Sequence, residues 1–314
     1  METVGLFLAA SLGTLLVGMF SSWVDRKVTA RIQYRVGPPL LQPVFDIAKL
    51  LGKETLISER ARGRGFLMAP LVGFSAAAVA AAILWFANVR PAHRFVGDLI
   101  VLIYILTIPA IAGIYGALAS GSPHAAVGAS REMKLLLAYE LPLVMSALVP
   151  VVQVSQNPDF GATFSLGTIV QFQQQAGWVL SSLSGILAAV VALVCLQAKL
   201  TLVPFDVPEA ETELMGGSVL EYSGPPLAVI RLTRVLLLAV APVYFATLFL
   251  GGLADAGSGW GWLAFAGKYV VVLVLIVLIR NTNPRLRIDQ TVRLFWYGLA
   301  PAAALAMVLA TLGY

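Results

Sequence analysis

Residues 97–119, GDLIVLIYILTIPAIAGIYGALA, decide the fold of this chain. Asp98 is the only charged residue in this stretch, and most of the others are apolar. A helix rises about 1.5 Å per residue, so a run of this length crosses the hydrocarbon core of a bilayer, which is about 30 Å thick. We therefore expect residues 97–119 to form a membrane-crossing helix.

Seven further apolar runs have the same character. They lie near 3–24, 66–88, 135–154, 179–198, 225–250, 263–279 and 294–312. Continuous apolar runs favour helices in lipid because a helix pairs its backbone polar groups within the segment, and the alternation of a membrane β-barrel is absent. The sequence therefore predicts an all-α, polytopic membrane protein with eight transmembrane helices in one membrane domain, 1–314.

The composition excludes several other classes. Hydrophobic residues make up 59% of the 314 residues and charged residues 12%, whereas soluble domains carry roughly 25% charge. Disordered and nucleic-acid-binding proteins do not fit this balance. One cysteine, Cys195, and two histidines, His93 and His124, fit neither a disulfide nor a haem or iron–sulfur site within the spans. We therefore predict no catalytic residue, metal or cofactor in this chain.

Lysine and arginine follow an alternating pattern. Eighteen of the 21 lie in or beside the segments after the first, third, fifth and seventh predicted spans, when Arg231 and Arg234, near the start of the run 225–250, are counted with the segment before that run. The positive-inside rule then places these four segments in the cytoplasm and both termini on the outer, periplasmic side. Met1-Glu2-Thr3 lacks the basic start of a cleavable signal. We expect a multi-pass protein of a bacterial or archaeal plasma membrane.

Residues 25–65 are predicted to form a basic cytoplasmic loop. Three cations spaced by four would share one face of a helix, which the Gly37-Pro38-Pro39 sequence would end: Lys27, Arg31 and Arg35. An amphipathic interfacial helix follows, with apolar residues at spacings of 4, 3 and 4: Leu40, Val44, Ile47 and Leu51. The cations either contact anionic headgroups or dock a soluble partner, and both can hold together.

Glu140 lies well inside the predicted span 135–154. A charged acid near a helix centre costs about 2.5–3.5 kcal/mol on insertion scales, so it must face protein or water. Pro142 and Pro150 favour a bent helix beside a hydrated pocket. A functional role is favoured over the alternative, a buried structural pair with an arginine.

The segment 199–224 is predicted to be an acidic cytoplasmic loop. Residues 204–224 read PFDVPEAETELMGGSVLEYSG and contain five carboxylates and no lysine or arginine: Asp206, Glu209, Glu211, Glu213 and Glu221. In a helix from Pro208, Glu209 and Glu213 would repel by about 2–3 kcal/mol, which raises their pKa values. The acids can then exchange protons. The alternative is a solvated loop, or partners for the cations of 25–65 and 280–293.

Residues 280–293 read RNTNPRLRIDQTVR. Four arginines surround Asp289 in this segment: Arg280, Arg285, Arg287 and Arg293. They can supply counter-charge to the acidic segment, although a simple basic inner loop is an equally good interpretation.

These motifs resemble a known family, the membrane subunit that links the peripheral redox arm to the membrane arm in respiratory complex I and in energy-converting NiFe hydrogenases. The resemblance spans nearly the whole chain and rests on four stretches: 25–38, PFDVPEAETE at 204–213, EYSG at 221–224, and 284–290. Eight spans with both termini outside also fit this family.

The hydrogenase branch is the closer resemblance. Gly128–Met133 and Ala138–Pro142 look like that branch. Thr201 and Leu202 stand where the quinone-reducing branch usually carries Asn-Arg, and EAETE replaces the usual EGESE. The fifth span offers only Gln197 where complex I subunits usually have an acid. We therefore expect the membrane subunit of an energy-converting NiFe hydrogenase.

The resemblance implies roles for individual residues. It implies an acidic, water-containing proton path along Glu140, Asp206, Glu209, Glu211, Glu213 and Glu221. It also implies an interface with the peripheral arm, to which the predicted contributors are Arg26, Lys27, Arg31, Arg35, Arg131, Lys134, Arg285, Arg287 and Asp289. The expected partners are hydrogenase large and small subunits and iron–sulfur subunits, which together would hold the NiFe centre and the clusters, and antiporter-like membrane subunits. The chain would couple electron transfer to proton or sodium translocation.

Three alternatives remain open at this point. The first is the quinone-site subunit of a complex I-type NADH:quinone oxidoreductase, the only one of these functions that would bring a quinone. The second is a stand-alone ion transporter, which would be active without partners, although the acids lie at the cytoplasmic end and not at the midplane. The third is a passive anchor, which leaves Glu140 unexplained.

Overall fold

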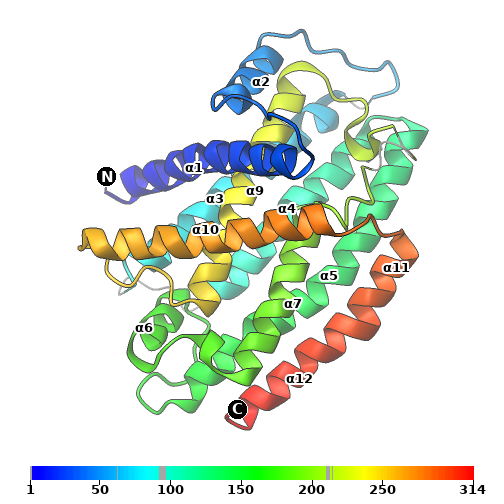
Figure 1. Ribbon diagram of the computed structural model, residues 1–314. Helices are drawn as coiled ribbons and strands as arrows, with labels where there is room; N and C mark the ends of the chain where they lie inside the picture. Colours follow the sequence, from blue (N-terminus) through cyan, green and yellow to red (C-terminus); the bar gives the residue numbers. More distant parts are fainter. Residues whose placement is uncertain (1, 62, 92–96, 210–212, 214) are drawn as a thin grey trace.

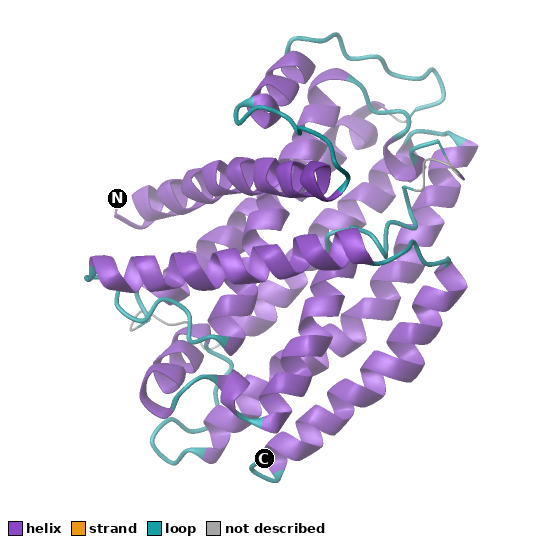
Figure 2. Cartoon of the chain, in the orientation of Figure 1, coloured by secondary structure: helices purple, strands orange, loops and turns teal. Residues whose placement is uncertain are grey.

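The computed structural model describes residues 2–61, 63–91, 97–209, 213 and 215–314. Every regular element in these ranges is a helix, as Figure 2 shows. The predicted all-α class is therefore confirmed for the described residues.

The helices are long and joined mostly by short segments (Figure 1). Their bounds are α1 Glu2–Ile32, α2 Gln42–Leu51, α3 Gly63–Val89, α4 Asp98–Ala119, α5 Pro123–Gln156, α6 Leu166–Ala176, α7 Leu183–Lys199, α9 Gly224–Phe249, α10 Gly259–Thr282, α11 Ile288–Arg293 and α12 Ala300–Thr311. Short 3₁₀ turns lie at Val179–Ser181 and Gly217–Val219, and a π-helical stretch, Leu294–Leu299, joins α11 to α12.

Seven helical stretches are long and apolar enough to cross a membrane. They are Gly5–Ile32, Gly63–Val89, Asp98–Ala119, Pro123–Gln156, Gly224–Phe249, Gly259–Thr282 and Ile288–Thr311. The predicted span 179–198 is α7, an apolar helix of only 17 residues, or about 26 Å at the usual rise. The structure thus supports seven crossings, and the eighth stays a prediction, as does the orientation of the termini.

The core forms around α9. It packs against α1 and α3, α3 packs against α4, and α5 joins this group to α7 and α12. Close approach is built into α1 at Gly18, where a Cβ atom would lie 2.5 Å from the carbonyl oxygen of Val235 in α9. Any larger side chain at Gly18 would push these two helices apart.

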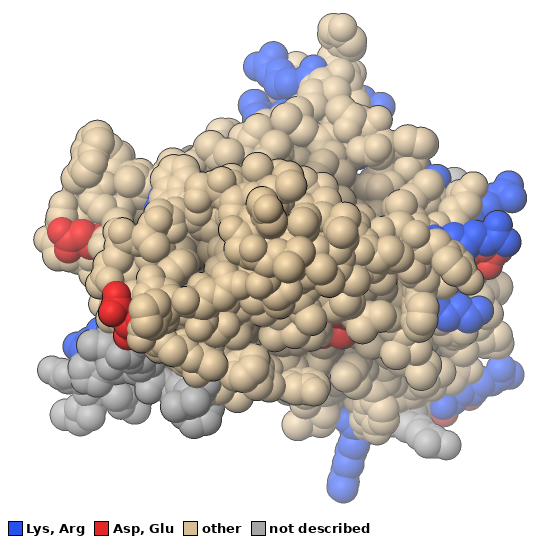
Figure 3. Space-filling model, turned by 90° about the horizontal axis from the view of Figure 1, so that it is seen from below, with Lys and Arg blue, Asp and Glu red and all other residues tan. Residues whose placement is uncertain are grey.

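The outer surface carries few charges. Figure 3 shows mostly uncharged side chains across the face seen from below, with lysine and arginine toward the rim. Large exposed apolar side chains occur along the helices, including Leu16 in α1, Val271 in α10 and Tyr297 before α12. Such a surface suits contact with lipid or with other membrane helices.

The basic loop differs from the prediction at Arg35. α1 continues to Ile32, and the chain then turns with Tyr34 at a φ of 59°, so that the Arg35 amide donates to the Ala30 carbonyl at 2.7 Å. Arg35 therefore lies beyond the helix, and the predicted row of three cations is wrong for this residue. A left-handed residue at the helix end caps its last carbonyls and stops it.

The amphipathic helix is α2, but only part of its predicted apolar stripe faces the protein. Ile47 is 8% exposed, whereas three other members of the stripe are exposed: Leu40, Val44 and Leu51. α2 packs against α9 and α1, so its other apolar face is available for lipid or a neighbouring subunit.

α5 begins at Pro123, about three turns before the predicted span 135–154. Proline suits the first turn of a helix because it lacks the N–H that would have no partner there. The early start places Glu132 inside α5 and not in the preceding loop. This difference matters for the site.

Candidate functional site: an acidic segment beside two cavities

The acidic segment joins α7 to α9 and is anchored by aromatic residues. Phe205 is 1% exposed, and its ring centre lies 5.1 Å from that of Phe295. Tyr222 stacks on Phe66 at 4.1 Å and donates a hydrogen bond to the Phe66 carbonyl at 3.0 Å. These contacts fix both ends of the segment, so its described carboxylates are held in defined positions.

Three of the acids have arginine partners from other elements. Asp206 lies 3.0 Å from the Arg285 guanidinium. Glu209 pairs with Arg234 of α9, and Glu213 pairs with Arg131 of α5. The fold therefore supplies these three acids with counter-ions that the segment itself lacks, and the Asp206–Arg285 pair matches the alternative that the acids pair with the cations of 280–293.

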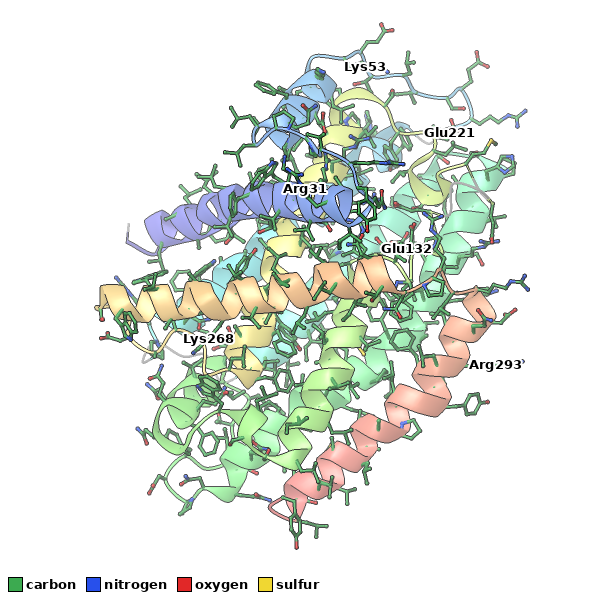
Figure 4. All side chains as sticks on the ribbon, viewed as in Figure 1. Arg31, Lys53, Glu132, Glu221, Lys268 and Arg293 are labelled. Atoms are coloured by element: carbon green, nitrogen blue, oxygen red, sulfur yellow. The ribbon has the colours of Figure 1, made fainter. Side chains whose placement is uncertain are left out.

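Of the other two acids, the structure describes Glu221 but not Glu211. Glu221 is half-buried near the end of the segment (Figure 4). Glu211 lies outside the described residues, as does most of the helix predicted from Pro208.

Glu213 is 55% exposed, so its pair with Arg131 is a surface contact, which contributes little to stability.

Asp206 keeps a raised pKa despite its arginine partner. Burial raises the pKa of this carboxyl to about 6, Glu209 adds to the rise, and Arg285 opposes it. The raised pKa therefore belongs to Asp206 with burial as its main cause, whereas the sequence predicted repulsion between Glu209 and Glu213.

The raised pKa of Asp206 predicts the direction in which the stability of the protein changes with pH. Between about pH 4 and 6 the folded state holds a proton that the unfolded state has lost, so the protein loses up to about 3 kcal/mol of stability as pH rises through this window. We expect Asp206→Asn to remove this pH dependence. Thermal unfolding of the assembled protein at pH 4.5 and 7 measures it, and an unchanged dependence in the variant would contradict the assignment.

Glu140 is paired inside the membrane domain, but with a lysine and not the arginine considered above. The Lys199 ammonium lies 3.4 Å from Glu140 Oε2. The Lys199 side chain is 5% exposed and that of Glu140 23%. Lys199 also lies over the Tyr139 ring, 5.3 Å from its centre. Sequence reasoning missed Lys199 because it closes an apolar helix where a basic residue commonly ends the span.

The first cavity lies among α3, α4, α5, α9 and the acidic segment. Its volume is about 90 Å³, and its lining includes four charged residues and Ser218: Glu132, Lys199, Glu209 and Arg234 are the charged ones. A water needs roughly 10–15 Å³ of such space, so several waters fit. The cavity therefore has room for water between the acidic segment and Lys199, the partner of Glu140.

Glu132 is the second residue that the sequence interpretation missed. It shares a hydrogen bond with Ser218 of the acidic segment and is half-buried on α5, where Figure 4 labels it. The signal was present in Pro123, which starts α5 early enough to carry Glu132 into the bundle.

The second cavity is larger and strongly charged. It has a volume of about 500 Å³ and lies between the ends of α1 and α10, α2, α9 and the segment after α7. Its lining contains four arginines and four carboxylates: Arg26, Arg231, Arg234, Arg280, Asp25, Asp46, Asp206 and Glu209. Glu209 and Arg234 line both cavities. This pair therefore lies where the two spaces meet.

The predicted interface residues divide into two groups. Three of them form ion pairs within the chain: Arg26 with Asp46 at 2.7 Å, Arg131 with Glu213, and Arg285 with Asp206. Lys27 is half-buried, and five others are exposed: Arg31, Arg35, Lys134, Arg287 and Asp289. The exposed group is the one that remains available to a partner.

Comparison with known proteins gives the family. The model of a family described as NADH dehydrogenase matches residues 5–311. The H subunit of the NADH-quinone oxidoreductase of Thermomicrobium roseum is 35% identical, with 93% of this chain and 90% of that protein covered. The corresponding protein of Anoxybacillus flavithermus is 33% identical, with 96% and 91% covered.

A solved structure supports the same family assignment. It is a chain in the structure of the membrane-bound sulfane sulfur reductase, an archaeal respiratory membrane complex, with a TM-score of 0.87 at 28% identity over 99% of this chain and 100% of that one. The resemblance to the complex I-like family is thus confirmed, whereas the hydrogenase branch receives no specific support. The chain belongs to the NADH dehydrogenase family of multi-pass membrane proteins, alongside the H subunits of NADH-quinone oxidoreductases.

Proposed function

We propose that this chain is the H-type membrane component of a complex I-like respiratory complex, where it anchors the peripheral redox module and couples that module's reaction to ion movement. The observation that carries the proposal is the match to the Thermomicrobium roseum protein, at 35% identity over 93% of this chain. The two adjoining cavities, which share Glu209 and Arg234, support the coupling role.

The coupling mechanism is electrostatic. A charge change in a docked redox module acts first on the larger cavity, where Asp206 can gain or lose a proton near pH 6. The Glu209–Arg234 pair passes the change to the smaller cavity. There Glu132 and the Lys199–Glu140 pair respond by moving a proton or by altering the field on a sodium ion farther inside.

The names of the relatives favour quinone reduction over the hydrogenase activity expected from the motifs. These relatives are named as components of NADH-quinone oxidoreductases, so the proposed partners are iron–sulfur peripheral subunits and antiporter-like membrane subunits, with quinone as acceptor. Hydrogenase subunits with a NiFe centre remain the second candidate because Gly128–Met133 and Ala138–Pro142 resemble that branch. The exposed cations Arg31, Arg35 and Arg287 suit docking of either module.

An assay of the purified complex separates the two candidates. We expect NADH-dependent reduction of a short-chain quinone and no hydrogen evolution from reduced ferredoxin or formate. Hydrogen evolution without quinone reduction would reverse the choice of complex. Ion movement by this chain alone in liposomes would contradict its role as one part of a larger complex.

A further inference from the structure

Lys199 is the most deeply buried cation among the described ion pairs. It ends α7, its side chain is 5% exposed, and its ammonium is held by the Glu140 carboxylate at 3.4 Å and by the face of Tyr139. Burying a charged pair costs several kcal/mol per ion, so such a pair is not by itself evidence of stability. The location of the pair therefore calls for another explanation.

Lys199 connects Glu140 to the hydrated cavity. Lys199 is part of the lining of the 90 Å³ cavity, together with Glu132 and Glu209. Among the described lining residues Glu140 does not occur, so the Lys199 side chain stands between Glu140 and the other two carboxylates. The lysine nitrogen therefore offers a route by which a proton can pass from this cavity to Glu140.

A smaller cavity beside Lys199 also supports contact between the lysine and water. It has a volume of about 10 Å³ and is lined by Lys199, Leu196, Tyr244 and apolar residues of α4 and α9. Tyr244 is 1% exposed, and within the described part of the chain its hydroxyl has no hydrogen-bond partner. This volume is at the lower limit for one water, and a water there would give the hydroxyl a hydrogen-bond partner next to the lysine.

We infer that Lys199 is a proton carrier that relays protons between the hydrated cavity and Glu140, a role that rests on the proposed coupling function. In the first step an N–H bond of the ammonium breaks and the proton forms an O–H bond on the Glu140 carboxylate, which leaves a neutral amine and a neutral acid. In the second step the amine takes a proton from the carboxylic acid of Glu132 through water in the cavity, which restores the ammonium and leaves Glu132 as a carboxylate. Burial favours the neutral pair because both charges are removed from a low-dielectric site.

The competing explanation is a structural ion pair that holds α7 against α5. These helices already pack against each other, and α7 adds buried residues such as Ala188 and Ala192 to the main apolar core. A structural pair needs only a fixed positive charge, which arginine supplies. A proton carrier must also lose its charge, which arginine does not do in proteins.

The test compares Lys199→Arg with Lys53→Arg, a matched change at an exposed position. The complete complex is reconstituted in proteoliposomes, and ion uptake is measured per electron transferred. We expect Lys199→Arg to assemble and transfer electrons but to lower uptake by about tenfold or more, with Lys53→Arg unchanged. Normal uptake by an assembled Lys199→Arg complex would overturn the inference.

A second pair of variants covers the case in which the larger guanidinium blocks assembly. Lys199→His keeps a group that titrates near pH 6.5, whereas Lys199→Gln has none. We expect the histidine variant to retain uptake with its pH optimum shifted to lower pH, and the glutamine variant to lose uptake. Equal loss in both would overturn the inference. If Glu140→Gln also kept normal uptake, the coupling function itself would fail, so the two failures are distinguishable.

Discussion

Glu140→Gln is expected to abolish ion translocation while the complex continues to transfer electrons. Glutamine has nearly the same shape as glutamate but cannot gain or lose a proton and is a weaker ligand for sodium. Glu140 is also the only described carboxylate paired with Lys199. We expect ion uptake per electron to fall by about tenfold or more, which is the largest effect predicted for any single carboxylate in this chain.

Stability must be separated from coupling in this variant. Removing one partner of a buried pair leaves the other charge uncompensated and costs about 3–5 kcal/mol. The double variant Glu140→Gln with Lys199→Gln removes both charges, so it should assemble better than the single variant and remain uncoupled. Glu59→Gln, at an exposed position of the basic loop, is the control. Normal uptake in either Glu140 variant would contradict the coupling role.

Glu209→Gln is expected to have the second largest effect. Glu209 lines both cavities and pairs with Arg234, so its charge is the connection between the docking side and the interior. Without it, Arg234 remains as an unpaired cation where the cavities meet. We expect several-fold lower ion uptake per electron, with electron transfer largely retained.

The control for Glu209→Gln removes one carboxylate charge at a position away from the two cavities, so it shows whether the effect depends on where the charge lies. Asp159→Asn neutralises an exposed carboxylate in the segment between α5 and α6, and we expect it to leave uptake unchanged. Adding Arg234→Gln to Glu209→Gln should improve assembly without restoring uptake. Full coupling in the double variant would show that the pair has no part in transmission.

Hydropathy predicted the spans well because each long apolar run is a local property of the sequence. Seven predicted spans correspond to helices that can cross a membrane, and the short helix α7 accounts for the remaining run. The predicted spans differ from the helices mainly at the helix ends. Helix starts depend on single turns, so Pro123 moved the start of α5 and brought Glu132 into the site.

Charge pairing could not be predicted because the partners are far apart in the chain. Asp25 pairs with Arg280 across 255 positions, and Glu213 with Arg131 across 82. The acidic segment contains no cation, yet the fold brings Arg234 of α9 and Arg285 beside it. Composition alone therefore suggested unpaired acids, whereas tertiary structure pairs three of them.

The pairing also changes which acids matter most. Glu213 forms a surface pair, whereas Asp206 and Glu209 line a cavity that Arg280 and Arg26 also line. The sequence named these acids together because they are neighbours in the chain. Only the fold distinguishes the acids that line a cavity from the one that faces outward.

Electrode-triggered infrared difference spectroscopy of the intact complex tests the central claim most directly, since it detects carboxyl groups that change protonation when the redox module is reduced. At pH 6 we predict a carboxylic-acid band in the reduced-minus-oxidised spectrum that weakens in Asp206→Asn and changes again in Glu140→Gln. Spectra in this region that are the same for the unaltered complex and both variants would contradict the account.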